Sequence, residues 1–301
     1  MQEDYTTIDY KSQVKKILRK TILKKEQNKK IVKWLNAEHK DDTALRVSHC
    51  ASSIGITDID GVARVVRADF CRERICAVCA WRRQSRFVAQ TTPVIQYMTE
   101  HGYKFLFATL TIKSVTYNSL ECSIDLLMRA FAALRHRKEI KQSWSGIIRS
   151  LELTINSENK TFHPHIHMLI AVKDNYFDSC YITQQRLSEI WKECLNVDYV
   201  PVVDIRTVDD NGAATVEVLK YSLKPTDDTL AYSAFYYIMR NRRLISFTGI
   251  FKKLRSDFKY SDFERVLTDD IPTGRHINYS LYRLDCTGGV YTYFKDKEFE
   301  L

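Results

Sequence analysis

The sequence predicts an α+β fold in which a central antiparallel β-sheet is flanked by helices. Residues 104–115, 146–155 and 163–172 place apolar side chains at every second position, which is typical of strands. Residues 119–137 repeat apolar side chains at helical spacing instead. The short loop at 156–160 joins two of the strand-like runs and predicts a β-hairpin, so the sheet is expected to be antiparallel.

Further elements follow from the same patterns. Helices are expected at 11–38, 81–98, from Thr183 onward, at about 213–224 and over roughly 231–260. A strand is expected at 199–208, and two strands surround a Thr-Gly-Gly turn near the end of the sequence. We expect three segments: a basic helical arm (1–44), a cysteine-rich segment with its following helix (45–100), and a mixed domain with C-terminal helices and a hairpin (101–301).

The charge balance points to a polyanionic partner. Lys and Arg number 46 against 37 Asp and Glu, which gives a formal net charge of +9. Nucleic acid is the first candidate and an anionic membrane surface the second. No apolar run approaches the roughly 20 residues of a membrane-spanning helix, and the first residues lack the apolar core of a signal peptide. A cytoplasmic protein with reduced thiols and no membrane partner is therefore expected.

The basic segment 11–38 has two readings. It is either a helical arm packed on the body with a solvated lysine face, or a contact to the DNA backbone. Its apolar stripe is broken and consists of Val14, Ile17, Leu18, Ile22, Ile31, Val32 and Leu35.

Four of the eight cysteines fall within thirty residues. Cys76 and Cys79 are separated by two residues, the spacing of a zinc knuckle, and Cys71 precedes them. Cys50 completes a set of four thiolates, and His49 is a substitute for it. Such a closed set predicts a structural Zn²⁺ site, whereas the alternative is a group of buried thiols without metal.

Three histidines alternate along the strand at 163–172. His165 and His167 share one face, and centring the hairpin loop near 158–159 sets Glu152 opposite them. Two imidazoles and one carboxylate leave coordination positions open, which fits a catalytic Mn²⁺ or Mg²⁺, or zinc, better than a structural site. The alternative is ordinary surface histidines. His163 is adjacent to a proline at the start of the strand. We therefore do not expect it to be a ligand, but to support the ligands or to contact DNA.

The helix at 213–224 carries a tyrosine with charged neighbours. Glu217, Tyr221 and Lys224 share one face, and Lys220 lies beside them. Tyrosine can attack phosphorus and form a phosphotyrosine, while glutamate can act as a general base. An amphipathic helix with a Glu–Tyr contact is the simpler reading of this segment alone. The apolar stripe on the other face comprises Val216, Leu219 and Leu223.

Together these pieces resemble the replication initiators of rolling-circle plasmids, within the HUH endonuclease superfamily. The resembling stretches are ADFCRERICAVCAWRR (68–83), FATLTIKSV (107–115), LELTINSENKTFHPHIHMLIAV (151–172), VEVLKYSLK (216–224) and, less closely, RLISFTGIFKKL (243–254). Ala77 departs from the proline that is usual in the cysteine knuckle, which concerns turn rigidity and not metal binding.

The resemblance implies an HUH-endonuclease core that nicks single-stranded or hairpin origin DNA. Tyr221 would be the nucleophile that stays joined to the 5′ end, and the free 3′-hydroxyl would prime synthesis. Glu217 would then activate water as the general base of termination, in place of the second tyrosine of many relatives. The resemblance also implies a host helicase and polymerase as partners, and a dimer is compatible with it.

Other residues are expected to contact DNA. Lys220 and Lys224 are predicted phosphate contacts, and the further DNA-binding candidates are Arg82, Arg83, Arg86 and His163. Two other functions compete with the initiator: a related HUH relaxase or transposase, and a zinc-stabilised DNA-binding protein without catalysis.

Overall fold

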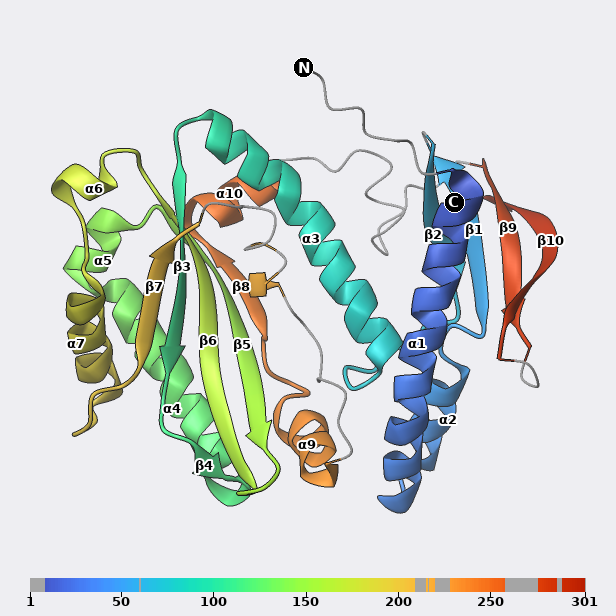
Figure 1. The fold of residues 1–301 in the computed structure, drawn as a ribbon, viewed down its shortest axis with the longest axis horizontal. Coiled ribbons are helices and arrows are strands. Elements are labelled where there is room, and N and C mark those ends of the chain that lie inside the picture. The colour runs from blue at the N-terminus through green and yellow to red at the C-terminus, as the bar shows by residue number, and fades with distance from the viewer. Residues whose placement is uncertain are drawn as a thin grey trace. The chain divides into compact units, whose positions relative to one another are not determined.

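The computed structural model describes residues 9–59, 61–208, 215, 217–219, 228–257, 276–285 and 289–300. The chain forms two compact units (Figure 1). The first comprises Met1–Arg86, Ser222–Asp227 and Tyr260–Leu301, and the second comprises Phe87–Tyr221 and Asp228–Lys259. None of the helices in the described part is long and apolar enough to cross a membrane.

The second unit is built on an antiparallel sheet of six strands with the order β7-β3-β6-β5-β8, and β4 pairs with β6. This confirms the predicted α+β class. The strands are β3 (Lys104–Thr111), β4 (Val115–Thr116), β5 (Gly146–Asn156), β6 (Thr161–Val172), β7 (Val203–Thr207) and β8 (Ile245–Thr248).

The expected hairpin forms in the expected register. β5 pairs with β6, and Glu152 lies directly opposite His165. On the other side of β6, Thr109 of β3 lies opposite His167. Because side chains alternate between faces along a strand, these four residues project from the same face of the sheet.

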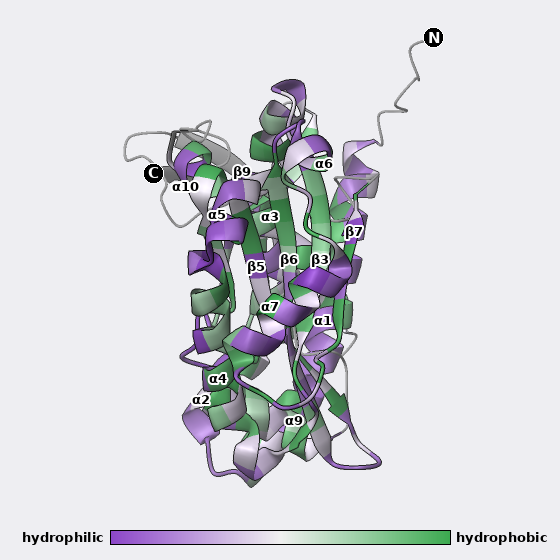
Figure 2. Ribbon diagram, turned by 90° about the vertical axis from the view of Figure 1, so that its left-hand side faces the viewer, coloured by the Kyte–Doolittle hydropathy of each residue, from purple (hydrophilic) through white to green (hydrophobic). Residues whose placement is uncertain are grey.

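Helices cover the other face of this sheet (Figures 1 and 2). They are α4 (Tyr117–His136), α5 (Lys138–Ser143), α6 (Tyr176–Ser179) and α7 (Gln184–Leu195). Ile166, Met168 and Ile170 of β6 are fully buried, as are Ile124 and Leu127 of α4. Burying such large aliphatic side chains contributes about 1.5–3 kcal/mol each, so this layer holds the strand that carries the histidines.

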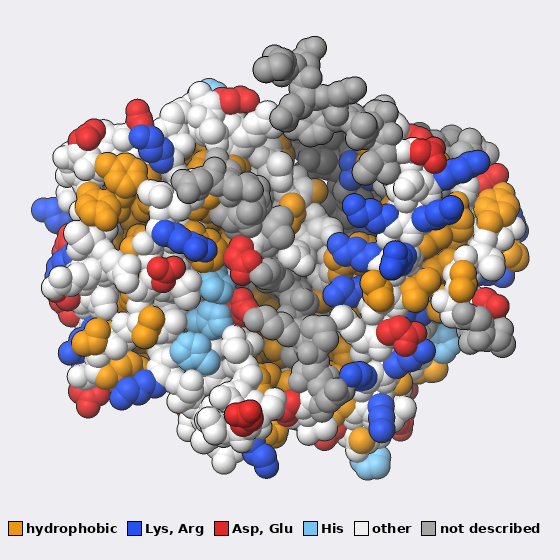
Figure 3. All heavy atoms as spheres, viewed as in Figure 1, with side chains coloured by type: hydrophobic (Ala, Val, Ile, Leu, Met, Phe, Trp, Pro, Cys, Tyr) orange, Lys and Arg blue, Asp and Glu red, His pale blue; other side chains and the backbone are white. Residues whose placement is uncertain are grey.

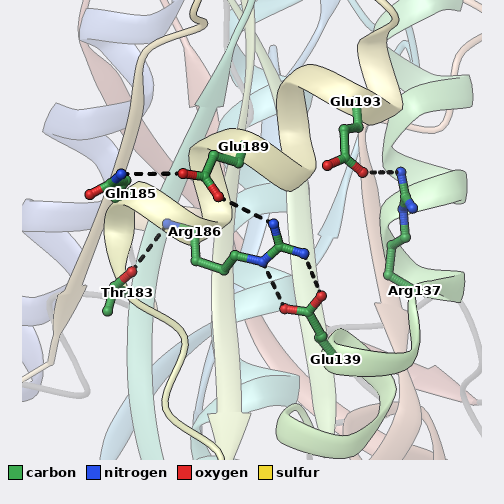
Figure 4. Close-up of polar contacts among 7 residues, drawn as sticks. All are labelled: Arg137, Glu139, Thr183, Gln185, Arg186, Glu189 and Glu193. Carbon is green, nitrogen blue, oxygen red and sulfur yellow. Dashed lines mark hydrogen bonds and ion pairs between the residues drawn. The ribbon is translucent and has the colours of Figure 1, made fainter.

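Polar contacts link α7 to the residues beside it (Figure 4). Arg186 bonds both carboxylate oxygens of Glu139 at 2.6 and 3.0 Å, and Arg137 bonds Glu193 at 2.8 Å. The Thr183 hydroxyl accepts the Arg186 backbone N–H at 3.1 Å and caps the helix, whose start was predicted at this residue. The ion pairs are exposed and stabilise little, so the cap and the buried face hold the helix.

The histidine-bearing face has an apolar half and a polar half. At one end the ring of Phe105 lies 6.2 Å from that of Phe251, a residue of α10 (Gly249–Asp257). Phe107 and Leu169 are also buried on this face. We predicted β3 as a strand buried on one face only; it is buried on both at this end because α10 covers it.

The helices expected over roughly 231–260 are present in the described residues, but a strand that was not expected lies between them. The structure has α9 (Thr229–Ser233), a π-helical turn (Ala234–Ile238), the strand β8 and then α10. β8 pairs with β5 at the edge of the sheet. Four residues are too short to show a strand period, and only the non-local pairing defines them.

The first unit combines strands from early and late parts of the sequence. Its antiparallel sheet has the order β10-β9-β1-β2, so β1 pairs with a strand more than 200 positions later. The antiparallel pairing of β9 with β10 confirms the two strands expected near the end of the sequence. The elements are α1 (Tyr10–Ala37), α2 (Asp41–His49), β1 (Ser53–Ile59), β2 (Val62–Ala68), β9 (His276–Leu284) and β10 (Tyr291–Glu300), and α3 (Ala77–Glu100) starts here and continues into the second unit.

Helix α1 buries part of the predicted stripe together with polar residues that the prediction left out. Thr21 and Asn28 fill the gaps in the apolar pattern and are 2% and 3% exposed. Thr21 donates to the Ile17 carbonyl oxygen at 2.9 Å, which satisfies its hydroxyl. The buried positions are Val14, Thr21, Asn28, Ile31, Trp34 and Leu35, whereas Ile17, Leu18, Ile22 and Val32 are half-buried. The helix is thus packed along its length.

Gly249 joins β8 to α10 in the left-handed backbone region, which residues with a Cβ atom rarely adopt. Its φ is +56°, and a Cβ atom there would overlap the carbonyl oxygen of Ser145.

We expect Gly249→Ala to lower the free energy of unfolding by about 2–3 kcal/mol in chemical denaturation. Gly102 is the matched control, since its φ is +78° but nothing lies within 4 Å of its Cβ position. Gly102→Ala should cost about 1 kcal/mol; equal losses for the two variants would contradict the steric argument.

Candidate metal centres

The polar half of the histidine-bearing face gathers three potential metal ligands. The Nε2 atoms of His165 and His167 are 3.2 Å apart, and Glu152 Oε2 lies 3.9 and 3.1 Å from them respectively. All three atoms lie within 4.8 Å of one another. In the space-filling view, histidine side chains form a continuous patch on this unit, with acidic side chains beside it (Figure 3). The sequence predicted this grouping from the hairpin register alone.

The hydrogen bonding of His165 sets its tautomer. Its Nδ1 lies 3.0 Å from the backbone carbonyl oxygen of His163, which can only accept. Nδ1 therefore carries the proton, and the lone pair of Nε2 faces the site. Burial lowers the pKa of His165, which keeps the ring neutral at neutral pH. A neutral imidazole with a free Nε2 is the form that binds a metal ion.

Thr109 positions the second imidazole. Its hydroxyl lies 3.0 Å from Nδ1 of His167, so the opposite ring nitrogen points toward Glu152. Thr109 was not among the predicted site residues. The signal was there in principle, because aligning β3 with β6 sets this threonine opposite His167. Metal-binding histidines commonly donate their second N–H to such a partner.

His163 lies outside this ligand group. Its Nδ1 is 3.3 Å from the Ser114 hydroxyl, and its ring centroid is 5.5 Å from that of His165. Burial lowers the pKa of His163 as well. Its backbone carbonyl orients His165, so the residue supports a ligand through its main chain, and its expected DNA contact stays a prediction.

The three ligand atoms fit a divalent cation. Neighbouring ligands of an octahedral ion with bonds of about 2.1 Å lie about 3 Å apart, and two of the three distances here are close to that. A set of two nitrogens and one carboxylate oxygen suits Mn²⁺, Mg²⁺ or Zn²⁺ and occupies one side of the ion only. The opposite side is left for water or a substrate oxygen.

The four predicted cysteines also meet. Cys79 Sγ lies 3.6 Å from the Sγ atoms of both Cys50 and Cys71, and with Cys76 all four sulfurs lie within 4.8 Å of one another. The edge of a zinc–thiolate tetrahedron with bonds of about 2.3 Å is about 3.8 Å, so the group fits zinc. His49 is not part of it, because its Nδ1 lies against the Leu45 carbonyl oxygen at 2.9 Å.

Helix α1 supports the cysteine cluster directly. The Asn28 amide donates to Cys76 Sγ at 3.2 Å and accepts the Ala77 backbone N–H at 2.8 Å. Lys25 donates to the carbonyl oxygen of Cys50 at 2.8 Å. Hydrogen bonds among the four thiols lower the pKa values of Cys76 and Cys79 and raise those of Cys50 and Cys71. The basic segment is therefore an integral part of this unit, as the packed-helix reading predicted.

Two of the arginines after the knuckle, Arg82 and Arg83, have partners within the first unit. Arg83 donates to the carbonyl oxygens of Arg72 and Glu73 at 2.8 and 3.0 Å. Arg82 lies over the Phe70 ring at 4.2 Å, and Arg86 is half-buried. These contacts brace the cysteine loop, and the proposed DNA contacts of the three arginines stay predictions.

Part of the predicted tyrosine helix is described. The Leu219 backbone N–H donates to the Thr215 carbonyl oxygen at 3.1 Å, which is a helical hydrogen bond. Leu219 of the expected apolar stripe is buried, whereas Glu217 is half-buried. Tyr221, Lys220 and Lys224 lie outside the described residues.

Residues 62–280 match the family described as Replication protein. The chain belongs to this family. The matched region contains the histidine group, three of the four clustered cysteines and the predicted tyrosine helix, and the membership makes the chain a replication initiator of the plasmid type.

Curated relatives agree with the family. A "Protein rep" of Streptococcus pneumoniae serotype 2 is 34% identical over 242 residues, which is 75% of this chain and 76% of the relative. A "Protein rep" of Bacillus amyloliquefaciens is 31% identical over 293 residues, or 87% of this chain and 86% of the relative. No solved structure matches the chain.

The Thr109 contact predicts a change in metal affinity. Thr109→Val keeps the side-chain volume but removes the partner of His167 Nδ1, so Mn²⁺ binding should weaken roughly tenfold, measured by electron paramagnetic resonance of the free ion. Thr154→Val is the control, because Thr154 is exposed on the same face and pairs with His163 instead. Equal affinities for the two variants would exclude the positioning role.

The cysteine geometry predicts one structural zinc per chain. Cys76→Ser should lose the zinc found by elemental analysis and should unfold at a lower temperature, because a buried ligand is missing. Cys122→Ser serves as control, since Cys122 is exposed and lies outside the cluster. A purified wild-type protein that folds fully without zinc would show that the thiols act as packing residues alone.

Proposed function

We propose that the chain nicks single-stranded or hairpin origin DNA by a metal-assisted tyrosine transesterification and so starts rolling-circle replication. The observation that supports this most is the one-sided ligand group of Glu152, His165 and His167 on the polar half of the sheet, in a chain of this replication family. A ligand set open on one side suits a reaction at phosphorus, whereas a protein that only binds DNA has no need of it.

The protein residues prepare the phosphate for attack. Mn²⁺ or Mg²⁺, when bound, polarises a non-bridging oxygen of the scissile phosphate and offsets the negative charge that develops on it. Glu152, His165 and His167 lie on two paired strands and would hold the ion there, while Thr109 and the His163 carbonyl orient the two rings. Rigid placement of this kind lowers the entropic cost of reaching the transition state.

Tyr221 is the proposed nucleophile. Its phenolic oxygen attacks phosphorus, the bond from phosphorus to the 3′ oxygen breaks, and that oxygen leaves with the electron pair. The products are a 5′-phosphotyrosine and a free 3′-hydroxyl, and the proton of the phenol ends on the leaving oxygen or in solvent. Lys220 and Lys224 would stabilise the phosphate charge.

Glu217 is the proposed general base of termination. A carboxylate one helical turn before the tyrosine can accept a proton from water, which then completes the second cleavage. Its half-buried position on a helical turn allows water to reach it. The 3′-hydroxyl made by the first cleavage is the natural primer for a host polymerase, with a helicase to separate the strands, and we include both as partners.

Replacing the nucleophile tests the reaction. Tyr221→Phe should form no covalent adduct with a single-stranded origin oligonucleotide in the presence of Mn²⁺, because the attacking oxygen is gone. Mass spectrometry of the adduct in the wild type should place the nucleotide on Tyr221.

Tyr237→Phe is the matched control, since Tyr237 lies in the same unit and is 48% exposed. It should react like the wild type. An adduct formed by Tyr221→Phe would refute the assignment, and a wild type that binds the DNA without cleaving it would favour a DNA-binding protein without catalysis.

A further inference from the structure

The four-stranded sheet of the first unit separates its charges between its two faces. The register sets Gly55 opposite both Arg67 and Leu281, and Leu281 opposite Lys295. Arg283 lies two residues after Leu281 in β9, and Lys297 lies two residues after Lys295 in β10. Both therefore fall on the same face as Leu281 and Lys295. Arg67, Arg283, Lys295 and Lys297 therefore project from one face, as does Arg64, which lies opposite Thr57.

Asp58 and Asp296, the acidic side chains that the structure describes in these strands, lie on the opposite face. Asp296 pairs with Ser280, and Asp58 lies two residues after Ile56, which also pairs with Ser280. Helix α1 reaches this acidic face: burial and the nearby Tyr282, Asp58 and Asp296 raise the pKa of Tyr10. The cationic face is therefore the one turned away from the start of α1.

The cationic face is hollowed. A depression of about 400 Å³ has charged and polar side chains in its lining, among them Arg67, Asp69, Arg283, Lys297, Ser52 and Ser53. The Tyr279 ring packs directly over Gly55, where a Cβ atom would overlap it. Three cations and the serine hydroxyls face a single carboxylate, so the lining favours an anion.

The side chains indicate which form of DNA fits. Unpaired bases bind by stacking on exposed aromatic rings. On this face Tyr279 is only 3% exposed. Phe294 is 45% exposed, but Arg283 already lies over its ring at 3.8 Å and Lys295 at 5.4 Å. A face of several cations, whose exposed ring is already stacked by an arginine, suits the phosphate backbone of a duplex.

We propose that the cationic sheet face, defined by Arg67, Arg283, Lys295 and Lys297, binds the phosphates of duplex DNA at the origin. The inference rests on the proposed origin-DNA function and adds a second site to it. The nicking group acts on an unpaired strand, and the sheet face holds the paired DNA that accompanies it. All residues of the face belong to the first unit.

The test compares two basic surfaces of that unit. A triple variant, Arg67→Ala with Arg283→Ala and Lys297→Ala, removes the lining cations. A second triple variant removes three exposed cations of α1: Lys15→Ala, Lys16→Ala and Arg19→Ala. Binding of a fluorescein-labelled 30-base-pair duplex from the replicon's own origin is measured by anisotropy at several salt concentrations. Adduct formation on the single-stranded nick-site oligonucleotide is measured in parallel.

The sheet variant should bind the duplex about tenfold more weakly and flatten the slope of log K against log salt by about 3, roughly one for each lost phosphate contact. Its adduct yield on single strands should equal that of the wild type, and the α1 variant should keep its duplex affinity. The variant Arg67→Lys with Arg283→Lys should retain binding because its charge is unchanged.

Several outcomes would overturn the inference. They are wild-type duplex affinity in the sheet variant, an affinity loss in the α1 variant alone, and a parallel loss of single-strand cleavage in a folded sheet variant. If the triple variant does not fold, the double variant Lys295→Gln with Lys297→Gln on exposed positions of β10 replaces it, and an unchanged salt slope then refutes the proposal. Failure of the proposed function is separate: no variant, the wild type included, would form the adduct.

Discussion

The register of β5 against β6 is the constraint on which the histidine site depends. Glu152 lies opposite His165 because the two strands pair without a shift over eleven positions. A slip of one residue would turn every side chain of a strand to the other face and would send the histidines into the layer packed on α4. The buried row of Ile166, Met168 and Ile170 opposes such a slip, since it would expose those side chains instead. Core packing and metal-site geometry are thus set by the same pairing.

The remaining contacts refine that arrangement. The apolar half of the histidine face is closed by α10, and the site lies where that cover ends, so the ligands are held by a packed sheet yet face outward. The His163 carbonyl and the Thr109 hydroxyl orient the rings. In the first unit the cysteine cluster has a comparable role, since it ties α1, α2 and the start of α3 around one group of sulfurs.

Local patterns predicted much of this and non-local pairing explains what they missed. The hairpin, its register and both ligand groups follow from period and spacing, because their partners lie close in sequence or share a recognisable spacing. β8 was missed because four residues carry no period, and the pairing of β1 with β9 has no local signal at all. The stripe of α1 was predicted only in part, because Thr21 and Asn28 are polar and were not counted in it; Asn28 is buried, with hydrogen bonds to the cysteine loop. The Thr109 contact required the register of β3, which the sequence reading did not attempt.

The central claim is that Glu152, His165 and His167 hold one divalent cation on an open side of the sheet. The most direct measurement is the anomalous scattering of crystals soaked in Mn²⁺, recorded at the manganese absorption edge. The account predicts one strong peak at about 2.0–2.3 Å from His165 Nε2, His167 Nε2 and a Glu152 carboxylate oxygen, with water in the other positions. A fully occupied manganese peak elsewhere, with none between these three side chains, would contradict it.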